Sequence, residues 1–320
     1  MTRALVTGAT GSIGSRVVAL LRERGVPVRA FVRDTGRARA LLGGDVELAV
    51  GDFDAPATVR AALDGISDLF LLTANHPRQI EHEVVLIDEA ADAGARVVKL
   101  SAIGAAAGSP LPFWDCHGRS EVHLHGASPA AVVLRASFYM SNTLAAADSV
   151  RGAGSIFAPA AGVRIAMIDP RDVAAAAAAL LAEGGHEGDT ITVTGPTAIT
   201  YDDVAEALSA VTGRSVAFVP VPDEAALAGL VDAGMPEWLA GNLVRLFGLL
   251  RAGAAAETSD GVRALTGAEP RSLADFMRDH AAAFGGEPAV AARALFGDEP
   301  ARPGRTPGRP GEATAIALPS

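Results

Sequence analysis

Three glycines near the N-terminus have the spacing of a loop that binds a dinucleotide. Gly8, Gly11 and Gly14 lie in the segment TGATGSIG, between a short apolar run at 4–7 and a helical pattern at 12–24. In this setting the first glycine makes a tight turn, the second lets the backbone approach a pyrophosphate, and the third lets helix and strand pack closely. The helix N-terminus adds N–H donors. A glycine-rich turn without a ligand is the alternative interpretation. The residues expected to contact the cofactor here are Gly8, Thr10, Gly11, Ser12, Ile13 and Gly14.

The end of the second apolar run, at 28–32, distinguishes the two forms of the dinucleotide. At this place an acidic residue binds the ribose 2′-hydroxyl of NAD, whereas an arginine accepts the 2′-phosphate of NADP. Arg33 directly follows this run and Arg37 comes within one further helical turn, so two guanidinium groups can reach a phosphate. Asp34 is expected to cap the next helix. The pattern favours NADP(H) over NAD(H), and a plain surface charge at Arg33 is the alternative.

Polar and small residues also follow the third, fourth and fifth apolar runs. In parallel sheets of this kind, ligands bind at the carboxyl ends of the strands. Asp52 and Phe53 follow the third run and are expected near the adenine, although Asp52 can equally be a loop acid that caps the following helix. The residues expected to face the nicotinamide, at the ends of the fourth and fifth runs, are Thr73, Ala74, Asn75 and Ser101.

These loops belong to a regular alternation of apolar runs and helical patterns. The apolar runs cover 4–7, 28–32, 46–50, 68–73, 97–100 and 131–135, and the helical patterns between them cover 12–24, 36–42, 57–63, 80–93 and 121–125. Strands separated by helices in this way indicate βαβ units on a parallel sheet that is buried on both faces. The predicted fold is therefore α/β, with a doubly wound Rossmann parallel sheet.

The pattern predicts three regions along the chain. Residues 1–150 form an NAD(P)-binding Rossmann domain, and 151–286 complete the sheet and form a small, mostly helical substrate lobe. The segment 287–320 is rich in Pro, Gly, Arg and Ala and is expected to be a disordered tail, because this composition cannot build a core. Within 151–286 we expect strand-like pieces in 155–168, helices at 172–182 and 200–211, a strand at 190–194, and further helices in 214–252 and 271–284.

The composition argues against several classes of protein. Among 320 residues, 27 Lys and Arg stand against 37 Asp and Glu, and the net charge of −10 argues against a nucleic-acid surface. The longest apolar run, at 173–182, is about half of the roughly 20 residues that a membrane span needs. The N-terminus lacks the pattern of a signal peptide. The single cysteine permits no internal disulfide. We expect a cytoplasmic protein whose partner is a small molecule.

Several segments together resemble the atypical short-chain dehydrogenase/reductases of the NmrA-like type, which include NADPH-dependent quinone and azo reductases and redox-sensing regulators. The resemblance covers residues 1–284. Its carriers are VTGATG at 6–11, VRAFVR at 28–33, GDFD at 51–54, KLS at 99–101, HGRSE at 117–121, LR at 134–135 and TGP at 194–196. The resemblance implies NAD(P) binding on a Rossmann fold.

The wider superfamily carries a Tyr-x-x-x-Lys pair after the fifth strand, in which the Tyr protonates a carbonyl and the Lys lowers its pKa. The resemblance places Phe113 at the Tyr position and His117 at the Lys position. Lys99 is the only lysine, and residue 95 is an alanine, so the chain has no such pair. His117 is expected to bind the ribose or transfer a proton, because the ordinary pKa of histidine lies near neutral pH. Its alternative is a packing role. Ser101 is the second candidate catalytic residue.

The substrate is expected to meet residues that follow the fifth and sixth apolar runs, with core packing as the alternative. These residues are Phe113, Trp114, Phe138, Tyr139 and Asn142. His117, Glu121 and His125 share one helical face, but the helix is short and no metal site is expected. Cys116 is expected to be a buried structural thiol rather than a nucleophile.

The missing tyrosine favours one class of reaction. Hydride delivered to a quinone or another activated conjugated aromatic gives a delocalised anion that needs little proton donation. We therefore expect an NAD(P)H-dependent oxidoreductase acting on such an acceptor, with aromatic polyketide tailoring as one example. The alternative is a non-catalytic NAD(P)-sensing regulatory protein of the NmrA type. A redox-neutral epimerase or dehydratase is disfavoured, because such enzymes normally keep the Tyr.

Overall fold

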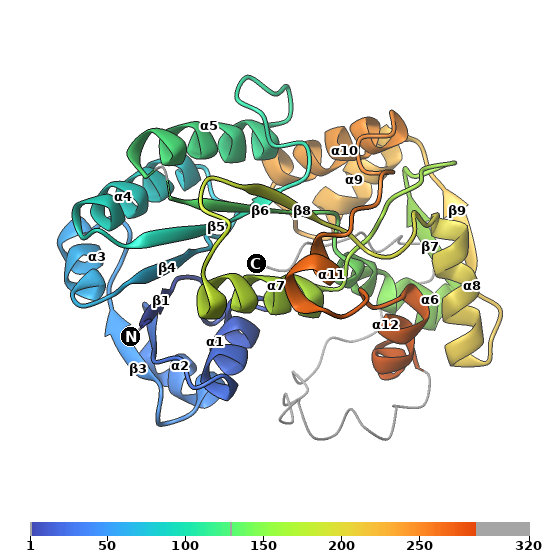
Figure 1. The fold of residues 1–320 in the computed structure, drawn as a ribbon. Coiled ribbons are helices and arrows are strands. Elements are labelled where there is room, and N and C mark those ends of the chain that lie inside the picture. Colours follow the sequence, from blue (N-terminus) through green and yellow to red (C-terminus); the bar gives the residue numbers. More distant parts are fainter. Residues whose placement is uncertain (1, 129, 286–320) are drawn as a thin grey trace.

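One parallel sheet with helices on both faces forms the larger part of the protein (Figure 1). The computed structural model describes residues 2–128 and 130–285. The tail predicted at 287–320 lies outside the described residues.

The central sheet has seven parallel strands in the order β3-β2-β1-β4-β5-β6-β8. The strands are β1 (Ala4–Val6), β2 (Val28–Val32), β3 (Glu47–Val50), β4 (Asp68–Leu71), β5 (Arg96–Ala102), β6 (Val132–Ala136) and β8 (Thr190–Val193). The chain builds outward from β1 to β3 and then continues on the other side of β1 with β4. In doubly wound sheets this reversal point, between β1 and β4, is where ligands bind.

Two groups of helices cover the two faces of the sheet (Figure 1). One group contains α1 (Gly14–Glu23), α2 (Thr35–Leu42), α7 (Pro170–Glu183) and α11 (Gly261–Thr266). The other group contains α3 (Pro56–Leu63), α4 (Gln79–Asp92) and α5 (Pro112–Ala127). Within β1, Ala4 and Val6 pack with the buried hydrophobic side chains of the first group of helices. Leu5 packs with those of the second group. Both faces of the strand are therefore buried, and the predicted doubly wound α/β fold is confirmed.

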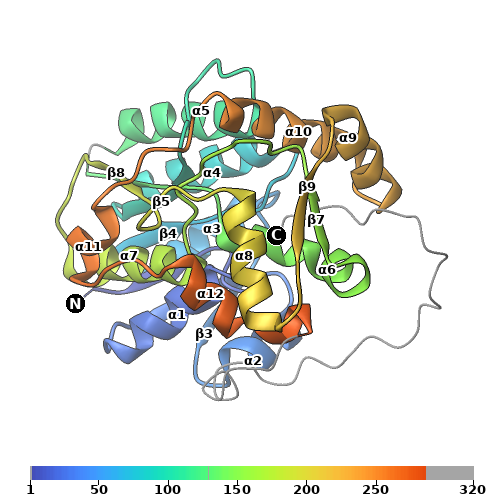
Figure 2. The same ribbon diagram turned by 90° about the vertical axis from the view of Figure 1, so that its right-hand side faces the viewer.

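A smaller lobe lies at the carboxyl ends of β5 and β6. Its elements are η1 (Met140–Ala146), α6 (Ala147–Ala153), β7 (Ser155–Ala158), α8 (Tyr201–Thr212), β9 (Ala217–Pro220), α9 (Asp223–Asp232), α10 (Glu237–Arg251), α12 (Leu273–Asp279) and η2 (Ala281–Phe284). Phe138 and Met140, just after β6, belong to the hydrophobic cluster of this lobe, and Ile103, just after β5, packs against it. Figure 2 shows α8, β7 and β9 in front of the sheet when the molecule is seen from the lobe side.

Two predictions for the elements need correction, and one helix was missed. The segment 214–252 is not purely helical, because β9 pairs in parallel with β7 in a second, two-stranded sheet. The helix predicted at 121–125 extends over the whole of α5, which begins at Pro112, a residue suited to a first helical turn. Helix α11 was not predicted. The predicted capping box is present: Thr200 and Asp203 bond each other's backbone amides at the start of α8.

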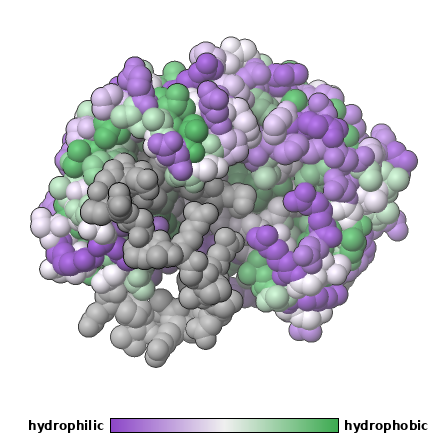
Figure 3. Space-filling view, turned by 180° about the vertical axis from the view of Figure 1, so that it is seen from behind, coloured by the Kyte–Doolittle hydropathy of each residue, from purple (hydrophilic) through white to green (hydrophobic). Residues whose placement is uncertain are grey.

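The surface mixes hydrophilic and hydrophobic residues, as the view from behind shows (Figure 3). The exposed large hydrophobic side chains of the described chain come from different elements, for example Leu41 on α2, Val122 on α5 and Trp238 on α10. Scattered apolar residues of this kind are ordinary and do not define a docking face. Across residues 2–128 and 130–285, every helix is too short or too polar to cross a membrane.

Candidate functional site

The loop between β1 and α1 makes the close backbone approaches that its glycines were predicted to allow. Gly8 has a φ of +61°, in the left-handed region, and a Cβ there would lie 2.9 Å from Cγ of Leu72, which follows β4. A Cβ on Gly14 would collide with the carbonyl of Gly8. The amide of Gly11 donates to that carbonyl over 2.9 Å and closes the turn. This turn at a helix N-terminus is the geometry that accepts a pyrophosphate.

The predicted contact residues of this loop differ in how far solvent reaches them. Gly8, Thr10 and Gly11 are partly exposed and Ser12 is exposed, whereas Ile13 and Gly14 are buried. The segment 8–12 can therefore touch a ligand with backbone and hydroxyl groups. Ile13 is part of the hydrophobic core between the sheet and the group of helices that contains α1 and α7, and it thereby anchors the loop.

Arg33 and Arg37 are both exposed after β2. Within the described residues, neither guanidinium forms an ion pair with a carboxylate. The carboxylate of Asp34 accepts a hydrogen bond of 3.0 Å from the amide of Arg37 and caps α2, as predicted. Two cations on one short segment, with the neighbouring acid occupied by the backbone, fit a phosphate group.

Asp52 and Phe53 follow β3, and their surroundings differ. Asp52 is exposed, and its carboxylate accepts a hydrogen bond of 3.0 Å from the amide of Asp54. It does not cap α3, whose N-cap position is Ala55. The ring of Phe53 stacks on that of Phe31 with centroids 5.4 Å apart. Contact of Asp52 and Phe53 with an adenine stays a prediction.

A buried ion pair lies close to the ends of β4 and β5. Nζ of Lys99 is 2.6 Å from Oε2 of Glu83, and their side chains are 0% and 1% exposed. The other oxygen of Glu83 accepts hydrogen bonds from Oγ1 of Thr73, over 2.6 Å, and from Nε2 of Gln79, over 2.9 Å. Burial by itself raises the pKa of Glu83, but the charges of Lys99 and His117, together with hydrogen bonds to the carboxylate, outweigh it and lower the pKa to about 2. The carboxyl group of Glu83 is therefore ionised at neutral pH. Ala74 and Asn75, which follow Thr73 and were also predicted to face the nicotinamide, are exposed.

His117 is next to this ion pair on α5. Its Nδ1 lies 3.4 Å from Nζ of Lys99, and its side chain is partly exposed. Burial, and then the charge of Lys99, lower the pKa of His117 to about 4, although Glu83 and Glu121 act in the opposite direction. With this pKa the ring of His117 is uncharged at neutral pH, so the ordinary pKa of histidine no longer supports the expected proton transfer, which stays a prediction. Its contact with a ribose or an acceptor oxygen stays a prediction.

Ser101 belongs to a second polar cluster that joins β5, α5 and β6. Its Oγ donates to Oε1 of Glu121 over 2.6 Å, and Arg135 binds both carboxylate oxygens of Glu121 with its Nε and Nη2. The hydroxyl proton of Ser101 is thus used inside the protein, and towards a ligand the hydroxyl can only accept a hydrogen bond. A role of Ser101 in catalysis or cofactor binding stays a prediction.

Two of the predicted substrate residues are packed in the protein interior. Trp114 is buried against Gly104, where a Cβ would lie 2.8 Å from the indole ring. Phe138 is buried in the lobe, with its ring centroid 6.1 Å from that of Phe247. Phe113, at the start of α5, is partly exposed. Substrate contact with these three residues stays a prediction, and for Trp114 and Phe138 the packing alternative is visible in the structure.

Tyr139 and Asn142 follow β6, where buried polar atoms lack partners. Tyr139 is partly exposed and packs against the sheet, and burial raises the pKa of its hydroxyl. Asn142 is 2% exposed, and its Oδ1 has no hydrogen-bond partner among the described residues; the same holds for the hydroxyls of Ser137 and Ser141. An unpaired buried polar group costs about 1 to 3 kcal/mol, so such a group is suited to bind a ligand or a water molecule.

The contacts of Glu83 and Arg135 beside the candidate site were not predicted from the sequence. The available signal was Lys99, a charged residue inside the apolar run 97–100, because a buried charge requires a partner. The sequence does not show that the partner is Glu83 on α4. Strand order decides this, since β4 and β5 are neighbours and α4 connects them.

A metal site and a thiolate nucleophile were the other kinds of chemistry considered for α5, and hydrogen bonds and burial disfavour both. The carboxylate of Glu121 is taken up by Ser101 and Arg135, and Nδ1 of His125 bonds the backbone oxygen of Glu121 over 2.7 Å. Among the residues that the structure describes, no group of three or more His, Cys, Asp or Glu side chains is arranged to hold a metal ion. Burial, followed by the charge of Glu83, raises the pKa of Cys116 to about 11. Its thiol is therefore protonated at neutral pH.

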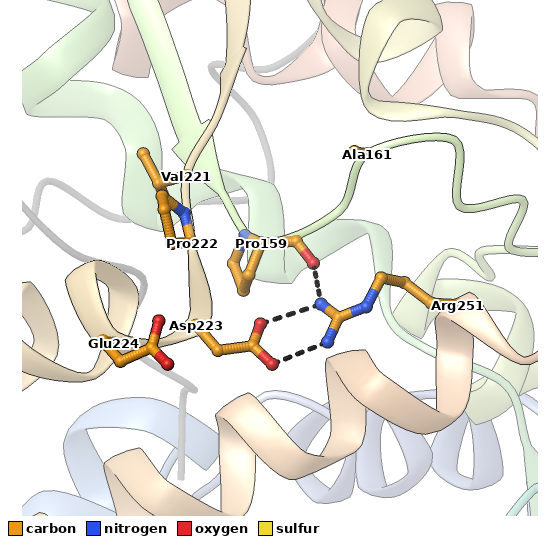
Figure 4. A pocket seen from close by; sticks show the side chains of 7 residues that line it. All are labelled: Pro159, Ala161, Val221, Pro222, Asp223, Glu224 and Arg251. Carbon is orange, nitrogen blue, oxygen red and sulfur yellow. Dashed lines mark hydrogen bonds and ion pairs between the residues drawn. The ribbon is translucent and has the colours of Figure 1, made fainter.

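A shallow pocket of about 320 Å³ lies in the lobe, apart from these residues (Figure 4). Arg251 of α10 crosses it, donating to both carboxylate oxygens of Asp223 over 2.9 and 2.7 Å and to the carbonyl of Pro159 over 2.5 Å. Its lining comes from the ends of β7 and β9 and from α9 and α10. It is thus separate from the carboxyl ends of the main sheet.

A parallel, doubly wound sheet with a glycine turn at its reversal point defines a dinucleotide-binding α/β protein. The sequence profile of the NmrA-like family matches residues 2–276, and the chain belongs to this family. The resemblance noted in the sequence is thereby confirmed.

Several similar proteins carry the names of reductases. The chain is 38% identical to an NAD(P)H azoreductase of Xenophilus azovorans, with 88% of this chain and 99% of the relative covered. It is 35% identical to a (4-alkanoyl-5-oxo-2,5-dihydrofuran-3-yl)methyl phosphate reductase of Streptomyces griseus, with 88% of this chain and 99% of the relative covered. Its fold is similar to that of the NADPH-dependent quinone oxidoreductase QOR2 of Escherichia coli complexed with NADPH, with a TM-score of 0.79, 28% identity, and 85% and 98% of the two chains covered.

Proposed function

We propose that this protein is an NAD(P)H-dependent oxidoreductase that reduces a quinone, an azo compound or another conjugated aromatic acceptor, with NADPH as the preferred cofactor. The observation that carries the proposal is the combination of a glycine turn for a pyrophosphate with two exposed arginines at the end of β2. The names of the relatives support the same reaction class. When bound, the nicotinamide supplies the hydride.

In this proposal, the residues of the chain bind the cofactor and orient the acceptor. The backbone of 8–12 and the N-terminus of α1 hold the pyrophosphate, and Arg33 and Arg37 hold the 2′-phosphate. Thr73, Ser101 and His117 line the side where the nicotinamide and the acceptor meet. Asn142 lies on the acceptor side, and its unpaired buried oxygen can take a hydrogen bond only from a donor group of the ligand or from water.

The acceptor class follows from the acid–base groups of this site. A strong proton donor is lacking, because position 113 is a phenylalanine and His117 is neutral at neutral pH. A conjugated acceptor spreads the charge of the added hydride over several atoms, and it takes its proton from water after the transfer. An isolated ketone gives a localised alkoxide that requires a proton donor. The proposal therefore includes quinones and azo compounds and excludes simple ketones.

The test is a panel of acceptors followed by the absorbance of reduced nicotinamide. Naphthoquinones and azo dyes should consume NADPH, and unactivated aliphatic ketones should stay near background. Exchange of His117 for Phe, which has no N–H group, should slow quinone reduction by about 10²-fold if the N–H of His117 bonds the acceptor. If the dinucleotide binds and no acceptor is consumed, the protein is a non-catalytic NAD(P) sensor instead. A cytoplasmic location and a role in aromatic polyketide tailoring belong to this proposal as well.

A further inference from the structure

The single lysine of the chain lies in the interior, where an ammonium group is costly unless all of its protons are bound. Lys99 is on β5 and its side chain is 0% exposed. Its three N–H groups have three acceptors in reach: Oε2 of Glu83 at 2.6 Å, the carbonyl of Leu100 at 3.3 Å and Nδ1 of His117 at 3.4 Å. The number of donors therefore equals the number of acceptors.

Three hydrogen-bond donors surround the carboxylate of Glu83, which is the ion-pair partner of Lys99. One carboxylate oxygen of Glu83 accepts from Lys99, and the other accepts from Thr73 and Gln79. A carboxylate bound by three donors stays ionised, and the ammonium group of Lys99 is its ion-pair partner at 2.6 Å. An ammonium group has no lone pair and can only donate. The ring nitrogen that faces it must therefore carry a lone pair and no proton.

We infer that Lys99 is a positioning residue that holds His117 in the tautomer with its proton on Nε2, so that the site presents a neutral N–H donor. Nε2 has no hydrogen-bond partner within the described residues, and the side chain of His117 is partly exposed. The group that it meets is a hydrogen-bond acceptor, either a ribose hydroxyl or the oxygen of the reducible substrate. This last step rests on the proposed function, whereas the tautomer itself does not.

The surroundings of His117 also disfavour the imidazolium ion, through burial first and the positive charge of Lys99 second. Burial and Lys99 favour the neutral ring, while Glu83, Glu121 and Arg135 are the other charged groups that act on it. His117 is thus suited to donate one hydrogen bond without transferring its proton. This arrangement orients an acceptor with conjugated bonds but does not supply the acid that an isolated ketone requires.

The tautomer can be measured directly by the nitrogen shifts of the histidine rings in long-range ¹H–¹⁵N correlation spectra. The signals of His117 are assigned by their loss in the His117→Gln variant. In the unmodified protein near neutral pH, we expect one fixed tautomer with a protonated Nε2 and a bare Nδ1. A protonated Nδ1, or shifts averaged between both tautomers, would overturn the inference.

A double variant tests whether Lys99 sets the tautomer. Lys99→Met combined with Glu83→Gln removes both charges together, so no buried ion is left without its partner. We expect the Nδ1–H tautomer to appear, and kcat for a quinone to fall by about tenfold while the Kd for NADPH changes little. A double variant that folds and keeps the fixed Nε2–H tautomer would refute the role of Lys99. The spectra do not depend on turnover, so an inactive protein with the expected tautomer contradicts only the proposed function.

Discussion

The carbonyl oxygen of Gly8 occupies the place that a Cβ on residue 14 would need. The start of α1 is thereby pressed against the turn that follows β1, and the N–H groups of the helix are brought to the reversal point of the sheet. Gly8 is itself close to Leu72 at the end of β4. The cofactor loop is therefore held between the two strands where the order of the sheet reverses.

Replacing Gly14 by Ala should damage both stability and cofactor binding. The added methyl group meets backbone atoms, which cannot move aside as a flexible side chain can, and overpacking of this kind costs about 1 to 3 kcal/mol. Urea denaturation and titration with NADPH measure the two effects. The matched control is Gly241→Ala in α10, where a Cβ has open space, and which should stabilise the protein by about 0.5 to 1 kcal/mol. Unchanged NADPH affinity in Gly14→Ala would argue against the loop as the pyrophosphate site.

Arg33→Ala should remove most of the preference for NADPH over NADH. Loss of a charged contact to the 2′-phosphate is expected to cost about 1.5 to 3 kcal/mol of NADPH binding and almost nothing of NADH binding. Calorimetric titration with both dinucleotides measures the difference. Arg245→Ala, on an exposed position of α10, serves as the control for removal of a positive charge. Equal affinities of the unmodified protein for the two cofactors would end this claim.

The protein should lose stability between about pH 6.5 and pH 4 through His117. The pKa of its folded-state ring is lowered to about 4 from the ordinary 6.5, so the unfolded chain binds the proton first as the pH falls. The stabilisation is fully present above pH 6.5 and disappears as the pH falls through about 4, with a total of about 3 kcal/mol. Urea denaturation over this range should show a steeper pH dependence for the unmodified protein than for His117→Gln. His123→Gln, which removes a partly exposed histidine of the same helix whose Nε2 lies 2.7 Å from Asp88, is the control and should stay closer to the unmodified protein than His117→Gln does.

Cys116 should react slowly with alkylating reagents and be dispensable for activity. Its pKa is raised to about 11, so the reactive thiolate is scarce at the pH of ordinary assays. Mass spectrometry after mild iodoacetamide treatment should find most of the native protein unmodified and the urea-unfolded protein fully modified. Cys116→Ala should keep the quinone reductase rate. A variant without activity but with intact NADPH binding would revive the thiolate as a nucleophile.

The sequence was sufficient for the sheet and for the cofactor loop because the physical signals are local. The spacing of Gly8, Gly11 and Gly14 between a strand and a helix specifies the turn by itself. Alternating apolar runs and helical patterns specify a parallel sheet. Asp34 as a cap and Thr200 with Asp203 as a capping box are equally local patterns, and both are present in the structure.

The polar side chains near the site could not be assigned in the same way. The partners of Lys99 are Glu83 on α4 and His117 on α5, and only the order of the strands brings these elements together. The change in the pKa of His117 follows from this contact and from burial, and neither can be read from the residue itself. β9 was missed because it is short and mostly exposed, and it has strand character only through its pairing with β7.

A single-turnover experiment without oxygen tests the central claim most directly. The protein is loaded with NADPH that carries deuterium at either face of nicotinamide C4 and is then mixed with a naphthoquinone in a stopped-flow instrument. The proposal predicts that the bound NADPH is consumed within one turnover. Deuterium should slow the reaction when it is on one face of C4 and should have little effect on the other face, because a single face delivers the hydride. NADPH that stays bound and unoxidised in the presence of excess quinone would contradict the proposal and identify the protein as a dinucleotide sensor.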